Sequence, residues 1–400
     1  MPQPLHATAP RAPFPLLVAM TACGTLGMHV IIPALPATAL ALGMSVSTAQ
    51  LTITLYLIGL ALGQLFYGPV SDRFGRRPVL LVGLGLFTLA GTMTALASSS
   101  GLLIGGRILQ SVGGCAGLVL GRAAVRDGAT AERAAGQLAL LTLVMSLVPA
   151  VAPAIGGILT AYFGWRASYV LLAVIGAATT LASVVLLPET NRSRVSGASI
   201  SSAFLAYVRL LRSPVFCGYA IGGACSTTAF YAFMSASPFI FENELNRTTT
   251  EVGMYYLVLM GGVALGSLLA NRVAGKLPIR TALRLANMLA IAGAALFALA
   301  DATNWLTVPT IIGPVALFMV GAGMASPFAL AGSVSVNPQA IGAASGMYGF
   351  VQMSYGMLCT IVVETWHPGA VYPVATVLLL SALAGQVAMS VATRPAKDDP

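Results

Sequence analysis

Long apolar runs follow one another along this 400-residue chain, and they limit its possible folds more than any other feature. A helix that crosses a membrane needs about 20 mostly apolar residues, and each run approaches or exceeds that length. The strands of a membrane β-barrel would instead alternate in polarity, and these runs do not. We therefore predict an all-α membrane protein with 12 transmembrane helices, at residues 13–36, 48–68, 78–98, 101–123, 135–160, 167–187, 214–236, 251–273, 278–300, 306–330, 341–363 and 370–392.

The composition agrees with a lipid environment. Charged side chains make up 8% of the sequence and hydrophobic ones 57%, whereas an average soluble domain carries about 25% charged residues. A soluble domain of this composition could not cover its surface with polar groups. The five cysteines all fall inside apolar runs, and their spacing suggests neither a disulfide framework nor a metal site. We expect no cofactor and no metal.

The basic residues predict the orientation. They concentrate in the connections after runs two, four, six and eight and at the chain ends, whereas the other connections carry only Arg166 and Arg247 and hold five acids: Glu242, Glu244, Glu251, Asp301 and Glu364. Loops rich in Lys and Arg stay on the cytoplasmic side, so we expect both termini there. The same rule explains the net charge of +9, and we therefore expect the lipid bilayer, rather than a nucleic acid, as the partner.

The longest polar interruption, residues 188–213, divides the predicted spans six and six. Each half has a basic turn between its second and third spans, D-R-F-G-R-R at 72–77 and N-R-V-A-G-K at 271–276. Repeated halves are a common layout of secondary transporters. We predict two pseudo-symmetric six-helix bundles, at 13–187 and 214–393, joined by a cytoplasmic linker at 188–213. Cytoplasmic tails would cover 1–12 and 394–400.

The most specific motif is Y-G-P-V-S-D-R-F-G-R-R-P, residues 67–78. A glycine such as Gly68 lets another helix approach closely, and Gly75 permits a tight turn. Asp72 can cap a helix or pair with an arginine. The arginines would face the anionic cytoplasmic leaflet; they are Arg73, Arg76 and Arg77. The motif acts either as a cytoplasmic gate or as a basic loop that only sets topology.

This pattern resembles the signature loop of the major facilitator superfamily. Other segments resemble its Bcr/CflA drug-resistance transporters, which are twelve-span drug:proton antiporters: L-Y-L-I-G-L-A-L-G-Q-L-F-Y-G-P (55–69), G-R-I-L-Q-S-V-G-G (106–114), V-P-A-V-A-P-A-I-G-G (148–157), F-G-W-R-A (163–167), S-A-S-P-F-I-F (235–241) and A-A-S-G-M-Y-G-F-V-Q (343–352). The resemblance implies the major facilitator fold in a bacterial inner (plasma) membrane. It also implies a monomer that exports a small-molecule substrate (amphenicol-, bicyclomycin- or sulfonamide-like) in exchange for protons.

Two polar residues lie inside span four. A charge such as Arg107 is costly within a membrane and must face a cavity or a partner. Gln110 lies one turn further on, so both side chains can address one point. The resemblance links the matching arginine to proton coupling or substrate. A purely structural link between helices is the alternative.

Span five carries Pro149, Pro153, Gly156 and Gly157. Prolines remove backbone hydrogen bonds and glycines permit close packing, which predicts a bent helix between the two halves. The pattern resembles the antiporter motif of the family, although Ala152 stands where the family usually has glycine. We interpret these residues as a hinge and packing surface rather than a binding site.

Further polar side chains inside spans are candidates for lining a substrate cavity: Tyr56, Gln64, Tyr231, Tyr348 and Gln352. A tyrosine in a span can equally be an interfacial anchor.

His29 stands alone in the first apolar run, in L-G-M-H-V-I-I-P-A-L-P at 26–36. Members of the Bcr branch resemble D-M-Y-L-P-A-L-P here, so His29 occupies the position of their membrane-embedded acid. Either His29 carries the proton or binds substrate, or it is a neutral, hydrogen-bonded histidine of the bundle. With Arg107 and without the acid, the cavity should favour neutral or anionic substrates over cations.

Other functions remain to be compared. A nutrient facilitator or symporter would share the fold and differ in the direction of transport. A channel would give flux that does not saturate. The sequence contains no metal-ligand cluster and no nucleophile motif, so we do not expect an enzyme.

Overall fold

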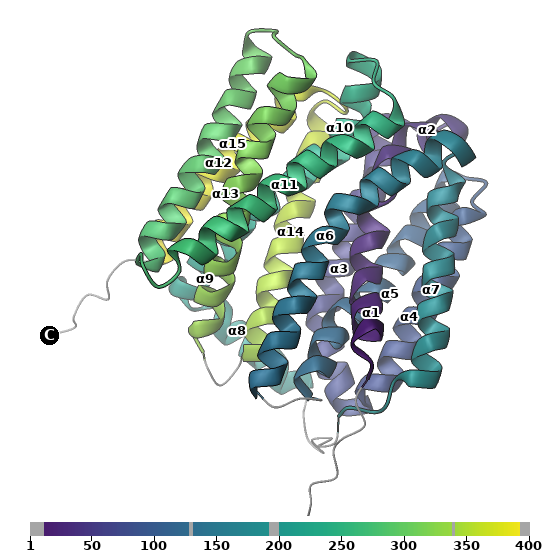
Figure 1. The fold of residues 1–400 in the computed structure, drawn as a ribbon, viewed down its shortest axis with the longest axis vertical. Helices are drawn as coiled ribbons and strands as arrows, with labels where there is room; N and C mark the ends of the chain where they lie inside the picture. Colours follow the sequence, from purple (N-terminus) through teal and green to yellow (C-terminus); the bar gives the residue numbers. More distant parts are fainter. Residues whose placement is uncertain (1–11, 128–130, 192–199, 338–340, 393–400) are drawn as a thin grey trace, which may run out of the picture.

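The computed structural model describes residues 12–127, 131–191, 200–337 and 341–392, and these ranges are helical without strands (Figure 1). The predicted tails 1–12 and 394–400 lie outside the described residues except for Ala12, as does part of the predicted linker. The elements are α1 Phe14–His29, η1 Ile32–Ala34, α2 Leu35–Ala41, α3 Val46–Phe74, α4 Arg76–Ala95, α5 Ser100–Asp127, α6 Ala131–Phe163, α7 Arg166–Leu186, α8 Ile200–Leu211, α9 Pro214–Thr227, α10 Phe230–Phe239, η2 Ile240–Glu244, α11 Thr249–Val273, α12 Ile279–Ala302, α13 Val308–Ser335, α14 Ile341–Trp366 and α15 Val371–Ala392.

The prediction of an all-α membrane protein is confirmed. Within the described ranges, 11 helices are long and apolar enough to cross a membrane, and the count reaches 12 when a bent pair is taken as one span. That pair begins in α8 and continues through α9, α10 and η2, with a bend of 87°. The bend lies at Ser213, because proline at 214 disfavours helical geometry in the preceding residue. The bend precedes the predicted seventh span, 214–236, which lies within the segment Pro214–Glu244 of this pair.

The helices form two sets. Helices α1 to α7 pack mainly against one another, and so do α9 to α15. We call these sets the first half and the second half. The most extensive contacts between them join α3 to α14 and α6 to α11, and Figure 1 shows α11 and α14 between the remaining helices of the two sets.

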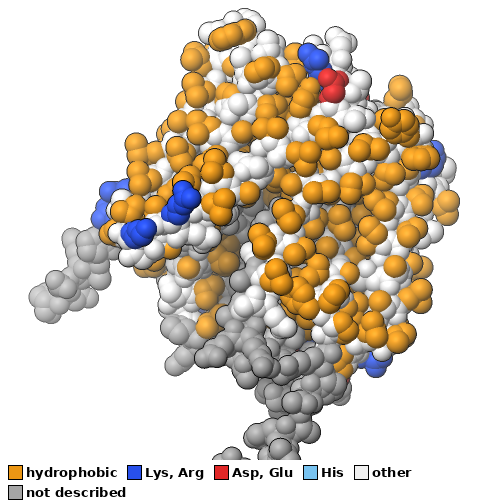
Figure 2. Space-filling model, viewed as in Figure 1, with side chains coloured by type: hydrophobic (Ala, Val, Ile, Leu, Met, Phe, Trp, Pro, Cys, Tyr) orange, Lys and Arg blue, Asp and Glu red, His pale blue; other side chains and the backbone are white. Residues whose placement is uncertain are grey.

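The two ends of the bundle differ in charge. The end at which α3 finishes and α4 begins carries the arginines of the 67–78 motif together with Arg122 and Arg126, and we call it the basic end. The other end, where α2 and α10 lie, is called the opposite end (Figure 1). Hydrophobic side chains cover the middle of the face drawn in Figure 2, and the charged ones lie near its margins. This distribution fits a belt of lipid around the bundle.

Small residues let the core helices of the first half touch. A Cβ on Gly114 of α5 would lie 2.8 Å from the Cα of Gly24 in α1. One turn along α5, a Cβ on Gly117 would lie 2.0 Å from the carbonyl oxygen of Met20. In lipid, the hydrophobic effect does not drive helices together. They associate instead through close packing of this kind.

Leucine at Gly117 should therefore destabilise the protein. The extra side chain must displace α1, and overpacking of this kind costs about 1–3 kcal/mol. We expect Gly117→Leu to lower the midpoint of thermal unfolding in detergent. Gly101→Leu is the matched control, since nothing lies within 4 Å of a Cβ at Gly101 on the same helix. Equal midpoints in the two variants would contradict the packing described here.

Candidate functional site

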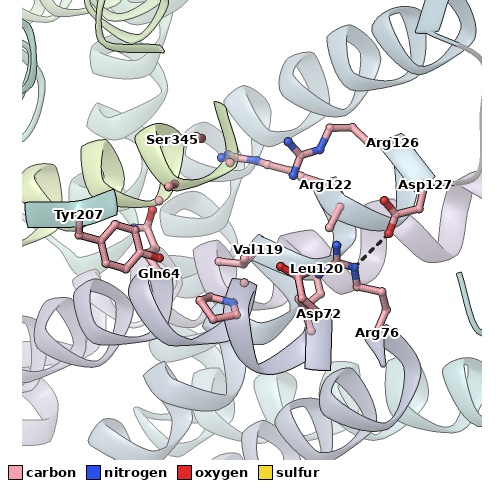
Figure 3. Close-up of a pocket in the computed structure, with 16 residues that line it drawn as sticks. Gln64, Asp72, Arg76, Val119, Leu120, Arg122, Arg126, Asp127, Tyr207 and Ser345 are labelled. Carbon is pink, nitrogen blue, oxygen red and sulfur yellow. Dashed lines mark hydrogen bonds and ion pairs between the residues drawn. The ribbon is translucent and has the colours of Figure 1, made fainter. Parts of the chain in front are cut away.

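A cavity of about 460 Å³ lies between the two halves at the basic end (Figure 3). Both halves contribute to its wall, through α3, α4 and α5 on one side and α8 and α14 on the other. The lining residues are Gln64, Gly68, Pro69, Asp72, Arg76, Val119, Leu120, Arg122, Ala123, Arg126, Asp127, Tyr207, Gly342, Ala343, Ser345 and Gly346. Three residues of the 67–78 motif therefore face a space shared by the two halves: Gly68, Asp72 and Arg76.

Arg76 organises the charges of this cavity. Its Nη1 lies 2.6 Å from Asp72 Oδ1 and donates to Ser71 Oγ at 2.5 Å. Its Nε lies 3.0 Å from Asp127 Oδ2, the contact dashed in Figure 3. Charge-assisted hydrogen bonds of this kind are stronger than neutral ones. All of these partners belong to the first half, so the cluster does not tie the halves together in this conformation.

Two further arginines leave the cavity positively charged. Arg122 and Arg126 lie next to each other on α5 (Figure 3). Within the described ranges neither forms an ion pair, whereas both aspartates of the wall are paired with Arg76. Three arginines thus face two aspartates in the lining. A basic wall attracts anions and repels cations.

Glu189 holds the turn of the 67–78 motif. Its Oε1 accepts the backbone N–H of Arg76 at 2.9 Å, and its Oε2 accepts that of Arg77 at 3.3 Å. Both N–H groups lie in the first turn of α4, where the helix itself provides no acceptor. Gly75 has φ 102°, and a Cβ there would lie 2.5 Å from Glu189 Oε2. Asn191 Nδ2 donates to the Asp72 carbonyl at 3.0 Å, so the segment after α7 fastens the turn.

Sequence reasoning missed Asp127 and Glu189. The sequence signal that could have indicated such a residue is Gly75, which precedes α4. Glycine has no side chain that could cap the helix, so an acceptor from another segment is needed. Asp127 is the last residue of α5, and only the fold brings it to Arg76.

Arg107 is fully buried in the first half and does not line the cavity. Its Nη1 donates to the Gly27 carbonyl at 2.6 Å and to Gln110 Oε1 at 2.7 Å. Its guanidinium lies 4.1 Å from the centre of the Tyr56 ring, a cation–π contact. Tyr56 in turn donates to the Gly24 carbonyl at 2.8 Å. Arg107 thus links α5 to α1 and α3, while its predicted role in proton coupling stays a prediction.

His29 is the last residue of α1 and is 6% exposed. Its Nδ1 lies 2.8 Å from the Thr25 carbonyl oxygen. Because a carbonyl only accepts, Nδ1 is the donor. No hydrogen bond joins His29 to Arg107 among those found in the described part of the chain. This geometry is that of a histidine bonded within its own helix, and the choice between the two interpretations of His29 stays open.

The predicted cavity-lining residues divide into two groups. Gln64 lines the cavity, and its side chain occupies the space that a Cβ on Gly349 of α14 would need. Tyr56, Tyr231, Tyr348 and Gln352 are not in the lining of this conformation.

The second group is held inside the halves because buried polar groups require partners. Gln352 Nε2 donates to Thr227 Oγ1 at 2.9 Å and to the Tyr348 hydroxyl at 3.2 Å. Tyr231 packs against Gly356, where a Cβ would lie 2.5 Å from its ring. A role for these residues in other conformations stays a prediction.

The span-five glycines bring backbones together, Gly156 within the first half and Gly157 where the two halves meet. A Cβ on Gly156 would lie 1.8 Å from the Val30 carbonyl oxygen, and one on Gly157 would lie 2.6 Å from that of Thr249 in α11. A Cβ on Gly253 of α11 would likewise lie 2.5 Å from the Pro153 carbonyl oxygen. Helix α6 runs without interruption through Pro149 and Pro153. The glycines of this motif thus contact neighbouring backbones, while its predicted role as a hinge stays a prediction.

The halves also meet at the opposite end, where α3 and α14 share a small polar cluster. Thr54 Oγ1 lies 2.7 Å from Thr360 Oγ1 and contacts a carboxyl oxygen of Glu364. Glu364 is only 3% exposed. We call these three residues the α3–α14 seal. Sequence reasoning placed Glu364 near an outer end of a span and did not select it, because its partner lies on another helix 310 residues away in sequence.

The comparisons with known proteins identify the class of protein. Residues 17–360 match the Major Facilitator Superfamily. The crystal structure of a D-xylose-proton symporter has the same fold, with a TM-score of 0.69 at 16% identity over 93% of this chain and 96% of that one. The chain therefore belongs to the major facilitator superfamily.

Its relatives confirm the resemblance to the drug-resistance branch. The chain is 33% identical to a chloramphenicol resistance protein of Pseudomonas aeruginosa, over 80% of this chain and 74% of that protein. It is 30% identical to multidrug resistance protein D of Escherichia coli, over 86% and 87%. It is 29% identical to a bicyclomycin resistance protein homolog of Haemophilus influenzae, over 83% of each.

The contact of Glu189 with the turn can be tested by stability. Glu189→Ala leaves three backbone donors without their acceptor, those of Arg76, Arg77 and Asn191, and loss of a helix cap costs about 0.5–2 kcal/mol. We expect a lower midpoint of thermal unfolding for Glu189→Ala. Glu189→Gln keeps an acceptor oxygen and should lose less. If the alanine variant were as stable as the wild type, the capping role would be wrong.

Proposed function

We propose that this protein is a secondary active transporter that exports small amphiphilic compounds by alternating access, in exchange for protons. One observation carries the proposal: a cavity with walls from both halves opens at one end, while the same halves meet at the other end. A carrier that works by rocking its halves needs this arrangement in each of its end states. A channel would instead need a continuous path.

We place the basic end in the cytoplasm of a bacterial cell, with the protein in the inner (plasma) membrane. Short basic connections favour this side, and the arginines of the 67–78 motif lie there. In this orientation the conformation is open to the cytoplasm, which is the side from which an exporter takes its cargo. A monomer contains all the cavity residues.

The substrate class follows from two arguments. The relatives include proteins named for resistance to chloramphenicol and bicyclomycin, which favours amphenicol-, bicyclomycin- or sulfonamide-like cargo. The unpaired Arg122 and Arg126 favour neutral or anionic molecules over cations.

We assign the gate role to the Asp72–Arg76–Asp127 cluster. Asp72 and Arg76 face Gly342 and Gly346 of α14 across the cavity. When the basic end closes, α14 must approach this cluster, so its charges can then bind the second half. The proton-coupling candidates remain His29, Arg107 and Gln110.

Export can be tested in a pump-deficient bacterial strain. Expression of the protein should raise the concentration of chloramphenicol needed to stop growth and lower its accumulation in the cells. A proton uncoupler should abolish the difference, because the gradient drives export. An ethidium-like cation should be exported poorly.

The same experiment separates the alternatives. Cells that accumulate more of a compound would indicate an uptake facilitator or symporter. Flux that does not saturate would indicate a channel. Strong resistance to ethidium-like cations would contradict the charge argument.

The gate role predicts the effect of Asp72→Asn. This change removes the charge of one of the two acids paired with Arg76 without changing the size of the side chain. We expect normal amounts of protein in the membrane and a drop in export of at least about tenfold, since a charge-assisted hydrogen bond contributes about 1.5–3 kcal/mol. Asp301→Asn, on α12 away from the cavity, is the control. Unchanged export by Asp72→Asn would count against the gate.

A further inference from the structure

Glu364 is an acid in a position where a charge is costly. It lies two residues before the end of α14, between the two halves, and it is almost fully buried. Within the described ranges, no Lys, Arg or His forms an ion pair with it, since the three pairs found involve other acids. A buried carboxylate without a counter-ion is unfavourable by several kcal/mol. The acid form avoids this penalty.

The hydrogen bonds of the seal indicate how many protons it needs. Three contacts form a chain: a carboxyl oxygen of Glu364 touches Thr54 Oγ1, Thr54 Oγ1 lies 2.7 Å from Thr360 Oγ1, and Thr360 Oγ1 lies 2.7 Å from the Met357 carbonyl oxygen. Each hydroxyl has one proton to donate, and a carbonyl has none.

Two threonine hydroxyls cannot fill three contacts. If Thr360 donates to Met357 and Thr54 donates to Thr360, the third contact needs a proton on Glu364. With an ionised Glu364, Thr54 must donate to the carboxylate and one of the other contacts loses its hydrogen. Only the carboxylic acid fills the whole chain, so the closed seal fits a protonated Glu364.

Among the hydrogen bonds found in the described ranges, the partner of Glu364 is Thr54, and no other titratable or charged group bonds it. Asp72 and Arg73 lie about 27 Å along α3 from Thr54 at 1.5 Å per residue. His367 follows α14 and its ring is 5.7 Å from that of Tyr372. The remaining groups on α14 and on the helices packed against it are Tyr56 and Tyr67 of α3, Tyr207 and Arg209 of α8, Cys217, Tyr219 and Cys225 of α9, Tyr231 of α10, Tyr348, Tyr355 and Cys359 of α14, and Tyr372 of α15. Helix α13 carries none.

We propose that Glu364 is an external proton-binding site that closes the opposite end of the transporter when it is protonated. An ionised Glu364 leaves one contact of the chain without a hydrogen. Water can supply that hydrogen when α3 and α14 separate, so the ionised carboxylate favours separation. A proton taken up from an acidic exterior completes the chain through Thr54 and Thr360 and seals the halves. The direction across the membrane rests on the proposed function, whereas the proton-dependent closure does not.

Amide hydrogen exchange of the purified full-length protein tests this site. The segments to follow are 46–57 and 354–366, with exchange corrected for the intrinsic effect of pH. Both should be protected at acidic pH and lose protection by about tenfold at alkaline pH, which is the change that a one-unit difference in proton affinity supports. Glu364→Gln is neutral at every pH and its amide can donate to Thr54. It should stay protected throughout.

Control variants separate Glu364 from its neighbours. Glu242→Gln removes another acid at the same end, which bonds Thr249 Oγ1 instead. Together with His367→Gln, it should keep the wild-type response to pH. A wild-type response in Glu364→Gln would overturn the proposal, and so would loss of the response in any control.

A second variant keeps the test decisive if Glu364→Gln fails to fold. Thr54→Val preserves the shape of the side chain but removes the acceptor of the Glu364 proton. The acid form is then less stable, so the seal should open at a pH about one unit lower. An unchanged midpoint would overturn the proposal. Because exchange requires no transport, a protein that switches with pH but exports nothing would contradict only the proposed function.

Discussion

The contact between α3 and α14 joins the two halves between the polar cluster at the opposite end and the cavity at the basic end. At the opposite end the two helices share the buried cluster of Thr54, Thr360 and Glu364. At the basic end the same helices line a cavity of about 460 Å³. Core helices within each half touch backbone to backbone, so we expect each half to move as a unit. Opening one end of this contact therefore tends to close the other.

Desolvation explains where the polar side chains lie. Lipid offers no partners, so polar groups inside the bundle favour partners within the protein. Arg107 binds a carbonyl, an amide oxygen and a tyrosine ring, and Gln352 binds a threonine and a tyrosine. Arg122 and Arg126 can remain without ion pairs because they face the cavity at the basic end. The same rule places a neutral acid, rather than a carboxylate, in the seal.

Features that depend on local sequence were predictable. Apolar length predicted the helices, and the 67–78 motif predicted the family. Gln64, which was selected because it is a polar residue inside a span, lines the cavity. Contacts between distant segments were not predictable from one sequence. Glu189 reaches the motif from 113 residues away, and Glu364 meets Thr54 from the other half. Tyr348 and Gln352 looked like cavity residues because their polarity is visible in sequence, whereas the buried partners that hold them are not.

Paired distance measurements would test alternating access directly. Spin labels can be placed at exposed residues in a variant without its five cysteines: Leu40 and Trp366 at the opposite end, and Phe74 and Ile341 at the basic end. When the pH is raised from acidic to alkaline, the Leu40–Trp366 distance should lengthen while the Phe74–Ile341 distance shortens. Distances that stay constant, or that lengthen together, would contradict a carrier whose halves rock about this contact.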